Sequence, residues 1–151
     1  MADAPEILGE QTFVEKDDGI QMELVCIVHG SPVPEIVWFR DGARVIPDNR
    51  IRAGRIGRKH LLTVDRITAE ADAGTYVCKA SNDKGQSMQS FRVLGEKICS
   101  ILSDYISQIR NPTYRGTLDK MHRYHAMLLC CVYSAQFQKA LLKKRMYFER
   151  I

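Results

Sequence analysis

Histidine and cysteine side chains are the residues of this chain that could carry metal or nucleophilic chemistry. His122, His125, Cys130 and Cys131 have the side chains of a zinc site. The two histidines share one helical face, but the cysteines follow more than another turn away, so the four would converge poorly on a tetrahedral ion. Surface histidines and buried thiols without metal explain this group better. Cys130 and Cys131 also allow acylation beside a basic segment.

His29 and His60 are the other two histidines, and neither has the neighbours that catalysis requires. They fall in separate predicted strands, without an adjacent serine and aspartate or a cysteine partner. A glycine-rich loop that could cradle phosphate is also missing. Because a site, and not a fold, supplies catalytic chemistry, we expect a protein that is not an enzyme and holds neither cofactor nor metal.

Two cysteines and the only tryptophan form the most specific pattern in the chain. Cys26 and Cys78 lie 52 positions apart, and Trp38 follows the first cysteine by twelve. This spacing suits an antiparallel sandwich with one sulfur on each of two sheets and an indole packed against both. The elements that must position these residues are therefore short strands.

The segment before Cys78 adds constraints of the same kind. Tyr76 stands two residues before the cysteine, where a tyrosine corner hydrogen-bonds back across a turn between strands. Asp72 and Gly74 shape that turn, since glycine relieves a crowded backbone and aspartate accepts from nearby amides. Leu62 lies on the strand that leads toward the turn, and we expect it to face the core.

Alternating apolar and polar residues predict seven or eight short strands over about 90 residues. Around Cys26 the alternation places the cysteine in the core. Residues 41–42 and 82–85 predict tight turns between strands. Residues 5–15 indicate an edge segment, because proline is accepted only where no ladder donor is required. The predicted fold class is an all-β, two-sheet antiparallel sandwich.

Residues 30–42 and 62–82 resemble the corresponding segments of immunoglobulin I-set domains. The cysteine spacing also fits this set better than the longer variable type, which has two extra strands. The resemblance covers about residues 5–94, within a domain predicted at 5–95. Such domains occur in intracellular muscle and cytoskeletal proteins resembling titin, twitchin, obscurin and palladin, and in neural cell-adhesion receptors. The resemblance implies a protein-binding or spacer module without catalysis.

The cysteines bear on the compartment, and two alternatives stay open. In a secreted or adhesion protein, Cys26 and Cys78 would form a disulfide whose loop closure contributes about 4 kcal/mol. In a cytoplasmic protein they would stay as buried thiols beside Trp38. An odd total of five cysteines, no recognisable signal peptide and no N-glycosylation acceptor favour an intracellular, cytoskeletal or sarcomeric location. An extracellular or cell-surface location is the alternative.

Residues 96–151 differ in composition from the domain before them. Residues 1–96 carry 12 Lys and Arg against 15 Asp and Glu, whereas residues 97–151 carry 10 against 3. Apolar residues from Ile98 to Ile109 follow helical spacing, and a second helix is predicted from Leu118 to about Tyr147. These helices could pair with each other or lie on a sheet. An unrelated extension without a partner is the alternative.

A basic helical segment near the end of this tail supports two binding hypotheses. Its apolar anchors and cations suit calmodulin, which grips apolar residues and surrounds them with acidic ones. The same segment could lie on an anionic lipid surface. A solvated helix end, with cations near the negative pole of the dipole, explains it without a ligand. The segment contains Phe137, Leu141, Lys143, Lys144, Arg145 and Met146.

Five basic residues within ten form a second candidate surface, which could dock an acidic partner such as actin or a phosphoinositide. Protection of an edge strand from edge-to-edge pairing is the alternative explanation. Nucleic acid is not expected, because no aromatic platform interleaves the arginines. No apolar run reaches the roughly 20 residues of a transmembrane span. Together with the 82–85 hairpin, the candidate partner-binding residues are Arg50, Arg52, Arg55, Arg58, Lys59, Asn82 and Gly85.

Overall fold

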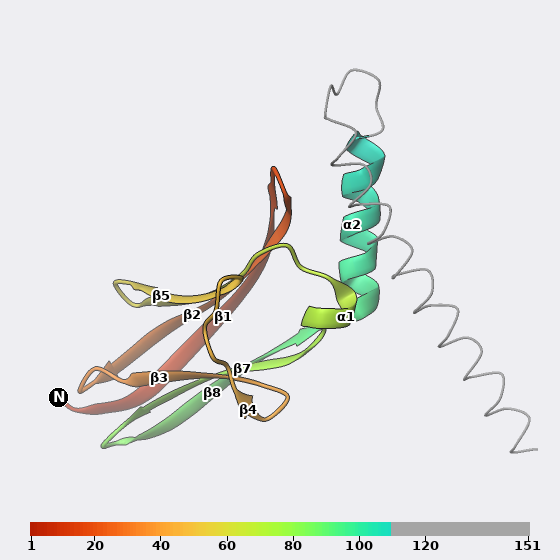
Figure 1. The fold of residues 1–151 in the computed structure, drawn as a ribbon. Helices are drawn as coiled ribbons and strands as arrows, with labels where there is room; N and C mark the ends of the chain where they lie inside the picture. The colour runs from red at the N-terminus through yellow and green to blue at the C-terminus, as the bar shows by residue number, and fades with distance from the viewer. Residues whose placement is uncertain (110–151) are drawn as a thin grey trace, which may run out of the picture. The chain divides into compact units, whose positions relative to one another are not determined.

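Eight β-strands and two helices make up the part of the chain that the structure describes (Figure 1). The computed structural model describes the backbone of residues 1–109 and the side chains of residues 1–105. The chain divides into two compact units. Among the described residues, one contains Met1–Ile67 and Gly74–Val93, and the other contains Thr68–Ala73 and residues 94–109.

The strands form two four-stranded antiparallel sheets, which confirms the predicted sandwich. Neighbouring strands pair in antiparallel register throughout. The first sheet has the order β1 (Asp3–Lys16), β2 (Gly19–Ser31), β6 (Lys59–Val64) and β5 (Ile51–Ile56). The second has the order β4 (Ala43–Arg44), β3 (Glu35–Arg40), β7 (Gly74–Asn82) and β8 (Gly85–Val93).

Strands β1 and β2 form a long hairpin, drawn in red and orange in Figure 1. Their pairing runs from Asp3 opposite Ser31 to Lys16 opposite Gly19, with a register shift between Asp3 and Glu6. Pro5 falls in that shift. Because proline has no N–H to donate to a ladder, an irregularity at the start of an edge strand is where it is tolerated.

The core lies between the two sheets and is built from alternate residues of the strands. Trp38 pairs in register with Cys78, and its ring centroid lies 6.1 Å from that of Phe91. Each fully buried large apolar side chain stabilises the fold by about 1.5–3 kcal/mol relative to exposure. The most completely buried side chains of this sandwich are Ile20, Met22, Leu24, Cys26, Leu62, Val64, Ile67, Tyr76 and Cys78.

Strand β1 also lies against β8, although the two are edges of different sheets. A Cβ added to Gly9 of β1 would lie 2.5 Å from Cγ of Gln89 in β8 and 3.0 Å from the Phe91 ring. A side chain at this position would force the Gln89 side chain to shift, so glycine suits this close approach. Strand β1 thus shields the β8 edge from pairing with other strands. Strand β5 is the last strand of its sheet, and it pairs with β6 on one side.

The second unit contains the helices α1 (Ala69–Asp72) and α2 (Gly95–Ile109). Thr68 caps α1, since its hydroxyl accepts from the Ala71 N–H at 3.2 Å. The sequence pattern predicted a turn at Asp72 and missed this short helix. Helix α2 corresponds to the first helix predicted in the tail. Its buried residues Ile98, Leu102 and Tyr105 follow the i, i+4, i+7 spacing of one helical face.

Candidate functional site

The paired sulfurs have a structural role. Cys26 on β2 and Cys78 on β7 are both free thiols with no solvent exposure. A hydrogen bond to Cys78, followed by burial, raises the pKa of the Cys26 thiol far above its ordinary value. Because the thiolate is the reactive form, Cys26 is inert as a nucleophile at neutral pH. The candidate disulfide between these cysteines stays a prediction.

The turn before β7 holds Gly74 in a conformation that glycine favours, with a φ of +153°. A Cβ at this position would lie 2.6 Å from Oδ2 of Asp41, whose other oxygen accepts from the Thr75 N–H at 2.9 Å. Within the second unit, Asp72 is fully buried and its carboxylate accepts from the Thr68 N–H at 2.8 Å. Gly74 and Asp41 shape the backbone at the end of the sandwich opposite the 82–85 hairpin, because Gly74 pairs with Val93 and Asn82 with Gly85.

Two of the five predicted basic residues contact Asp65 and Arg66, which follow β6. Arg52 of β5 forms an ion pair with Asp65, with Nη2 3.0 Å from Oδ2. Arg50 donates from Nη1 to the carbonyl oxygens of Asp65 at 3.1 Å and Arg66 at 3.3 Å. Arg50 and Arg52 thus connect the start of β5 to the chain that follows β6. Such exposed contacts contribute only about 0–1 kcal/mol each to stability.

The other three basic residues gather at the hairpin that joins β5 to β6. Arg55 donates from Nε to the carbonyl oxygen of Gly57 at 2.8 Å, and Gly57 turns the chain with a φ of +60°. Arg58 places Nη1 3.0 Å from Nδ1 of His29 on β2. Lys59 is exposed beside them. The sequence therefore predicted one basic surface where the structure has two groups with different surroundings.

Asn82 connects three segments at one end of the sandwich. Its amide nitrogen donates to the carbonyl oxygens of Asp3 at 2.8 Å and Pro32 at 3.0 Å. Its side-chain oxygen accepts from the N–H groups of Lys84 at 2.9 Å and Gly85 at 3.2 Å. The hairpin at 82–85 thus holds the start of β1 and the β2–β3 loop in place.

A cavity of about 890 Å³ opens at this end of the sandwich. We call it the hairpin groove, after the β5–β6 hairpin that forms one of its walls. Its volume lies in the range of about 300–1,000 Å³ that is usual for ligand sites. It is lined by Asp3, Ala4, Pro5, Glu6, Val28, His29, Gly30, Ser31, Val33, Pro34, Arg55, Gly57, Arg58 and His60. Sequence reasoning found Arg55 and Arg58 but missed the groove, because its walls come from three separated segments.

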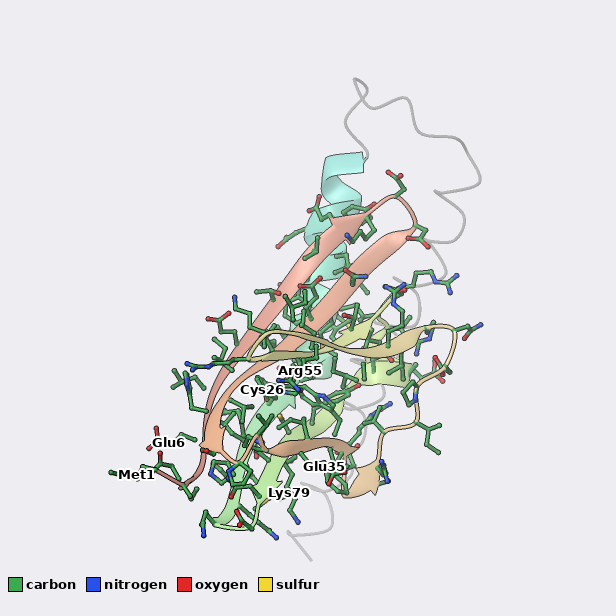
Figure 2. All side chains as sticks on the ribbon, turned by 90° about the vertical axis from the view of Figure 1, so that its left-hand side faces the viewer. Met1, Glu6, Cys26, Glu35, Arg55 and Lys79 are labelled. Atoms are coloured by element: carbon green, nitrogen blue, oxygen red, sulfur yellow. The ribbon has the colours of Figure 1, made fainter. Side chains whose placement is uncertain are left out.

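The register of the first sheet explains why Arg55 and His60 lie together in the lining of the groove. His60 lies opposite Cys26 on one side and opposite Arg55 on the other, so the three form one row across the sheet. Figure 2 labels Cys26 and Arg55 of this row. Paired residues of adjacent strands point to the same face. Burial, and then the charge of Arg55, lowers the pKa of His60 below its ordinary value.

Several predicted sites lie outside the described residues. These are the calmodulin or membrane segment, from Phe137 to Met146, and the histidines and cysteines at positions 122–131. Within residues 1–109, no three His, Cys, Asp or Glu side chains come together as metal ligands would. Neither helix of that described part has the length and apolar character needed to span a membrane.

Comparison with protein families decides the relationship. The model of the immunoglobulin I-set domain matches residues 5–94. The chain belongs to the immunoglobulin I-set family. This I-set chain is 42% identical over 76 residues to neuroglian of Drosophila melanogaster, which covers 50% of this chain and 6% of neuroglian. It is 39% identical over 66 residues to the muscle M-line assembly protein unc-89 of Caenorhabditis elegans, covering 43% of this chain and 1% of that protein.

Solved structures agree with this assignment. A complex of titin M10 with an obscurin-like 1 immunoglobulin domain contains a chain with a TM-score of 0.54 and 30% identity, covering 62% of this I-set chain and 94% of that one. The titin tandem A164–A165 has a TM-score of 0.52 and 34% identity, covering 61% of this chain and 47% of that one. Relatives therefore include both muscle and adhesion proteins.

Proposed function

We propose that this I-set chain is a non-catalytic protein-binding and spacer module of an intracellular cytoskeletal or sarcomeric protein. One observation carries the proposal: Cys26 and Cys78 pack as buried thiols in a complete sandwich core. A core built in this way does not depend on oxidation, which suits a reducing compartment. Similarity to unc-89 and to the titin homolog of Caenorhabditis elegans, 33% identical over 76 residues, supports a muscle context.

The partner surface in this proposal is the open edge formed by β5 and its hairpin. Strand β5 pairs with β6 on one side and ends its sheet on the other. An unpaired edge can accept a partner's backbone, and nearby side chains then select the partner. Arg55, Arg58 and Lys59 would provide the selection, whereas Arg50 and Arg52 are engaged within the sandwich.

The state of the thiols in native material tests the compartment. Cells that express the full-length parent protein are lysed into denaturant with an alkylating reagent and no reductant, and the peptides of Cys26 and Cys78 are analysed by mass spectrometry. We expect both cysteines to be alkylated directly, and the tagged protein to follow cytoskeletal or sarcomeric structures in muscle cells. Alkylation that requires prior reduction would contradict the intracellular assignment.

The second candidate is an extracellular adhesion domain that binds a copy of itself or a receptor. Two observations favour it. The 42% identity to neuroglian exceeds that to unc-89 and to the titin homolog, and the full cysteine, tryptophan and cysteine set is present. The same alkylation experiment separates the two functions, because an adhesion domain would carry the Cys26–Cys78 bridge.

A regulatory tail that binds calmodulin or anionic membrane is a third proposal, supported by the sequence of residues 137–151 alone. A synthetic peptide of this region should bind calmodulin with calcium and release it when calcium is chelated. Calcium-independent binding would exclude the calmodulin form. Binding to phosphatidylserine vesicles that salt abolishes would support the membrane form.

A further inference from the structure

The hairpin groove contains two guanidinium groups, those of Arg55 and Arg58, that form no direct ion pair with the described residues. Some other basic residues of the sandwich have carboxylate neighbours, for example Arg52 with Asp65 at 3.0 Å and Arg66 with Asp18 at 3.8 Å. Among residues 1–105, no carboxylate lies within ion-pair distance of Arg55 or Arg58. Their charges therefore act on whatever occupies the groove.

The surrounding contacts hold these two groups in place. Arg55 is anchored through Nε to the Gly57 carbonyl oxygen, which leaves its terminal nitrogens for another acceptor. Arg58 contacts Nδ1 of His29 at 3.0 Å. Since a guanidinium has donors and no acceptor, this contact requires an unprotonated Nδ1. The two arginines thus stand on a short hairpin with restricted positions, which reduces the entropy lost when they bind an anion.

The remaining walls of the groove are mixed. Val33 is exposed at 68% and, with the buried Pro34 and Pro5, provides apolar surface. Asp3 and Glu6 lie on the β1 wall and oppose an anion. A ligand that suits all walls carries a carboxylate toward the hairpin and an apolar group toward Val33.

We propose that the hairpin groove binds an extended acidic peptide segment of a partner protein, with a carboxylate held by Arg55 and Arg58 and an apolar neighbour on Val33 and Pro34. This inference deepens the proposed function and rests on it, because it names the chemistry of the partner. Guanidinium groups bind carboxylates with paired hydrogen bonds, and a peptide with alternating acidic and apolar residues presents each kind to one side when extended.

The test uses the full chain and a fluorescein-labelled peptide in which glutamate and valine alternate, measured by fluorescence anisotropy at physiological ionic strength, where the Debye length is about 8 Å. Arg55→Gln and Arg58→Gln should each weaken binding roughly three- to tenfold, because each removes one partly exposed charged hydrogen-bond donor group. Glu6→Gln should tighten binding about two- to threefold, because it removes an opposing charge. Circular dichroism confirms that each variant is folded.

Arg92→Gln is the matched control. Arg92 is exposed on β8, next to Val93 and thus at the other end from the 82–85 hairpin, and its loss changes net charge equally. It should leave the dissociation constant within about twofold, since exposed charges beyond a Debye length are screened. A second peptide with glutamine in place of glutamate should not bind.

Several results would overturn the proposal. One is equal weakening by Arg92→Gln and Arg55→Gln, which indicates nonspecific attraction. Another is no binding of the glutamate peptide at millimolar concentration, including the case in which phosphoinositide vesicles bind through the same arginines. If the peptide tests fail but the protein still localises to cytoskeletal structures, the peptide-binding role of the groove is disproved and the proposed function stands. If the peptide binds but the native chain carries a Cys26–Cys78 bridge, the intracellular location is disproved and peptide binding in the groove stands.

Discussion

Replacing Cys26 and Cys78 by alanine, singly and together, is the most informative perturbation of the sandwich. Both side chains are fully buried, face each other from β2 and β7, and lie beside Trp38. If the pair acts as two thiols, the cost of substitution is a packing cost alone. If the pair forms a covalent bridge, substitution also removes the restriction that the bridge places on the unfolded chain, and the loss of stability is larger.

The two cases differ in magnitude. Removing one buried sulfur loses its transfer free energy and leaves a small cavity, about 1–2 kcal/mol in total. The double substitution should cost less than the sum of the single ones, because the contact between the sulfurs is lost only once. A bridge that closes a loop of 52 residues would instead contribute about 4 kcal/mol, and reductant would remove it.

Urea unfolding with and without a phosphine reductant distinguishes these cases. We expect the free energy of unfolding of the natural chain purified from muscle cells to be the same under both conditions, and the slope against urea to be unchanged. The double variant provides the control, since reductant has no sulfur pair to act on. A loss of several kcal/mol on reduction in the natural chain, absent from the double variant, would refute the reasoning and support the adhesion alternative.

Two further predictions concern glycine positions and pH. Gly54→Ala should stabilise the chain by about 0.5 kcal/mol, because no atom lies within 4 Å of the added Cβ, whereas Gly74→Ala should destabilise it by about 2 kcal/mol through its positive φ and the clash with Asp41. Thermal unfolding of both variants checks this, and equal melting temperatures would contradict it. Because the pKa of His60 is lowered in the folded chain, its contribution to stability is present above the ordinary value of 6.5 and is lost as pH falls through the folded pKa. The melting temperature should therefore fall less steeply between pH 7 and 5 in Arg55→Gln and in His60→Gln, and slopes equal to that of the natural chain would exclude this role.

The sandwich was predictable because its signals are local and agree with one another. Trp38 and the two cysteines have a spacing that few folds accommodate, and alternation around each cysteine places it inward. The turn at 82–85 also has residues that suit a hairpin, and β7 and β8 meet there. Helical spacing from Ile98 to Ile109 predicted α2 in the same way.

The candidate site was only partly predictable, because the role of a basic residue depends on its neighbours. Five basic residues looked equivalent in the sequence, yet Arg52 forms an ion pair with Asp65 whereas Arg55 and Arg58 line the groove. Helix α1 was missed because four residues are too short for a periodic signal. Close approach of Gly9 to β8 could not be foreseen, since glycine in a strand has several explanations.

Spacing and alternation in the chain were enough to establish the class of fold, the inward position of Cys26, Trp38 and Cys78, and the basic character of the β5 hairpin. These properties depend on short-range periodicity and composition, which a linear sequence records. The hairpin groove and the division of the arginines depend on strand register, which brings Arg55, His60 and Cys26 into one row from distant positions. Register arises when both sheets bury their inner faces together, so it became visible only in the folded chain.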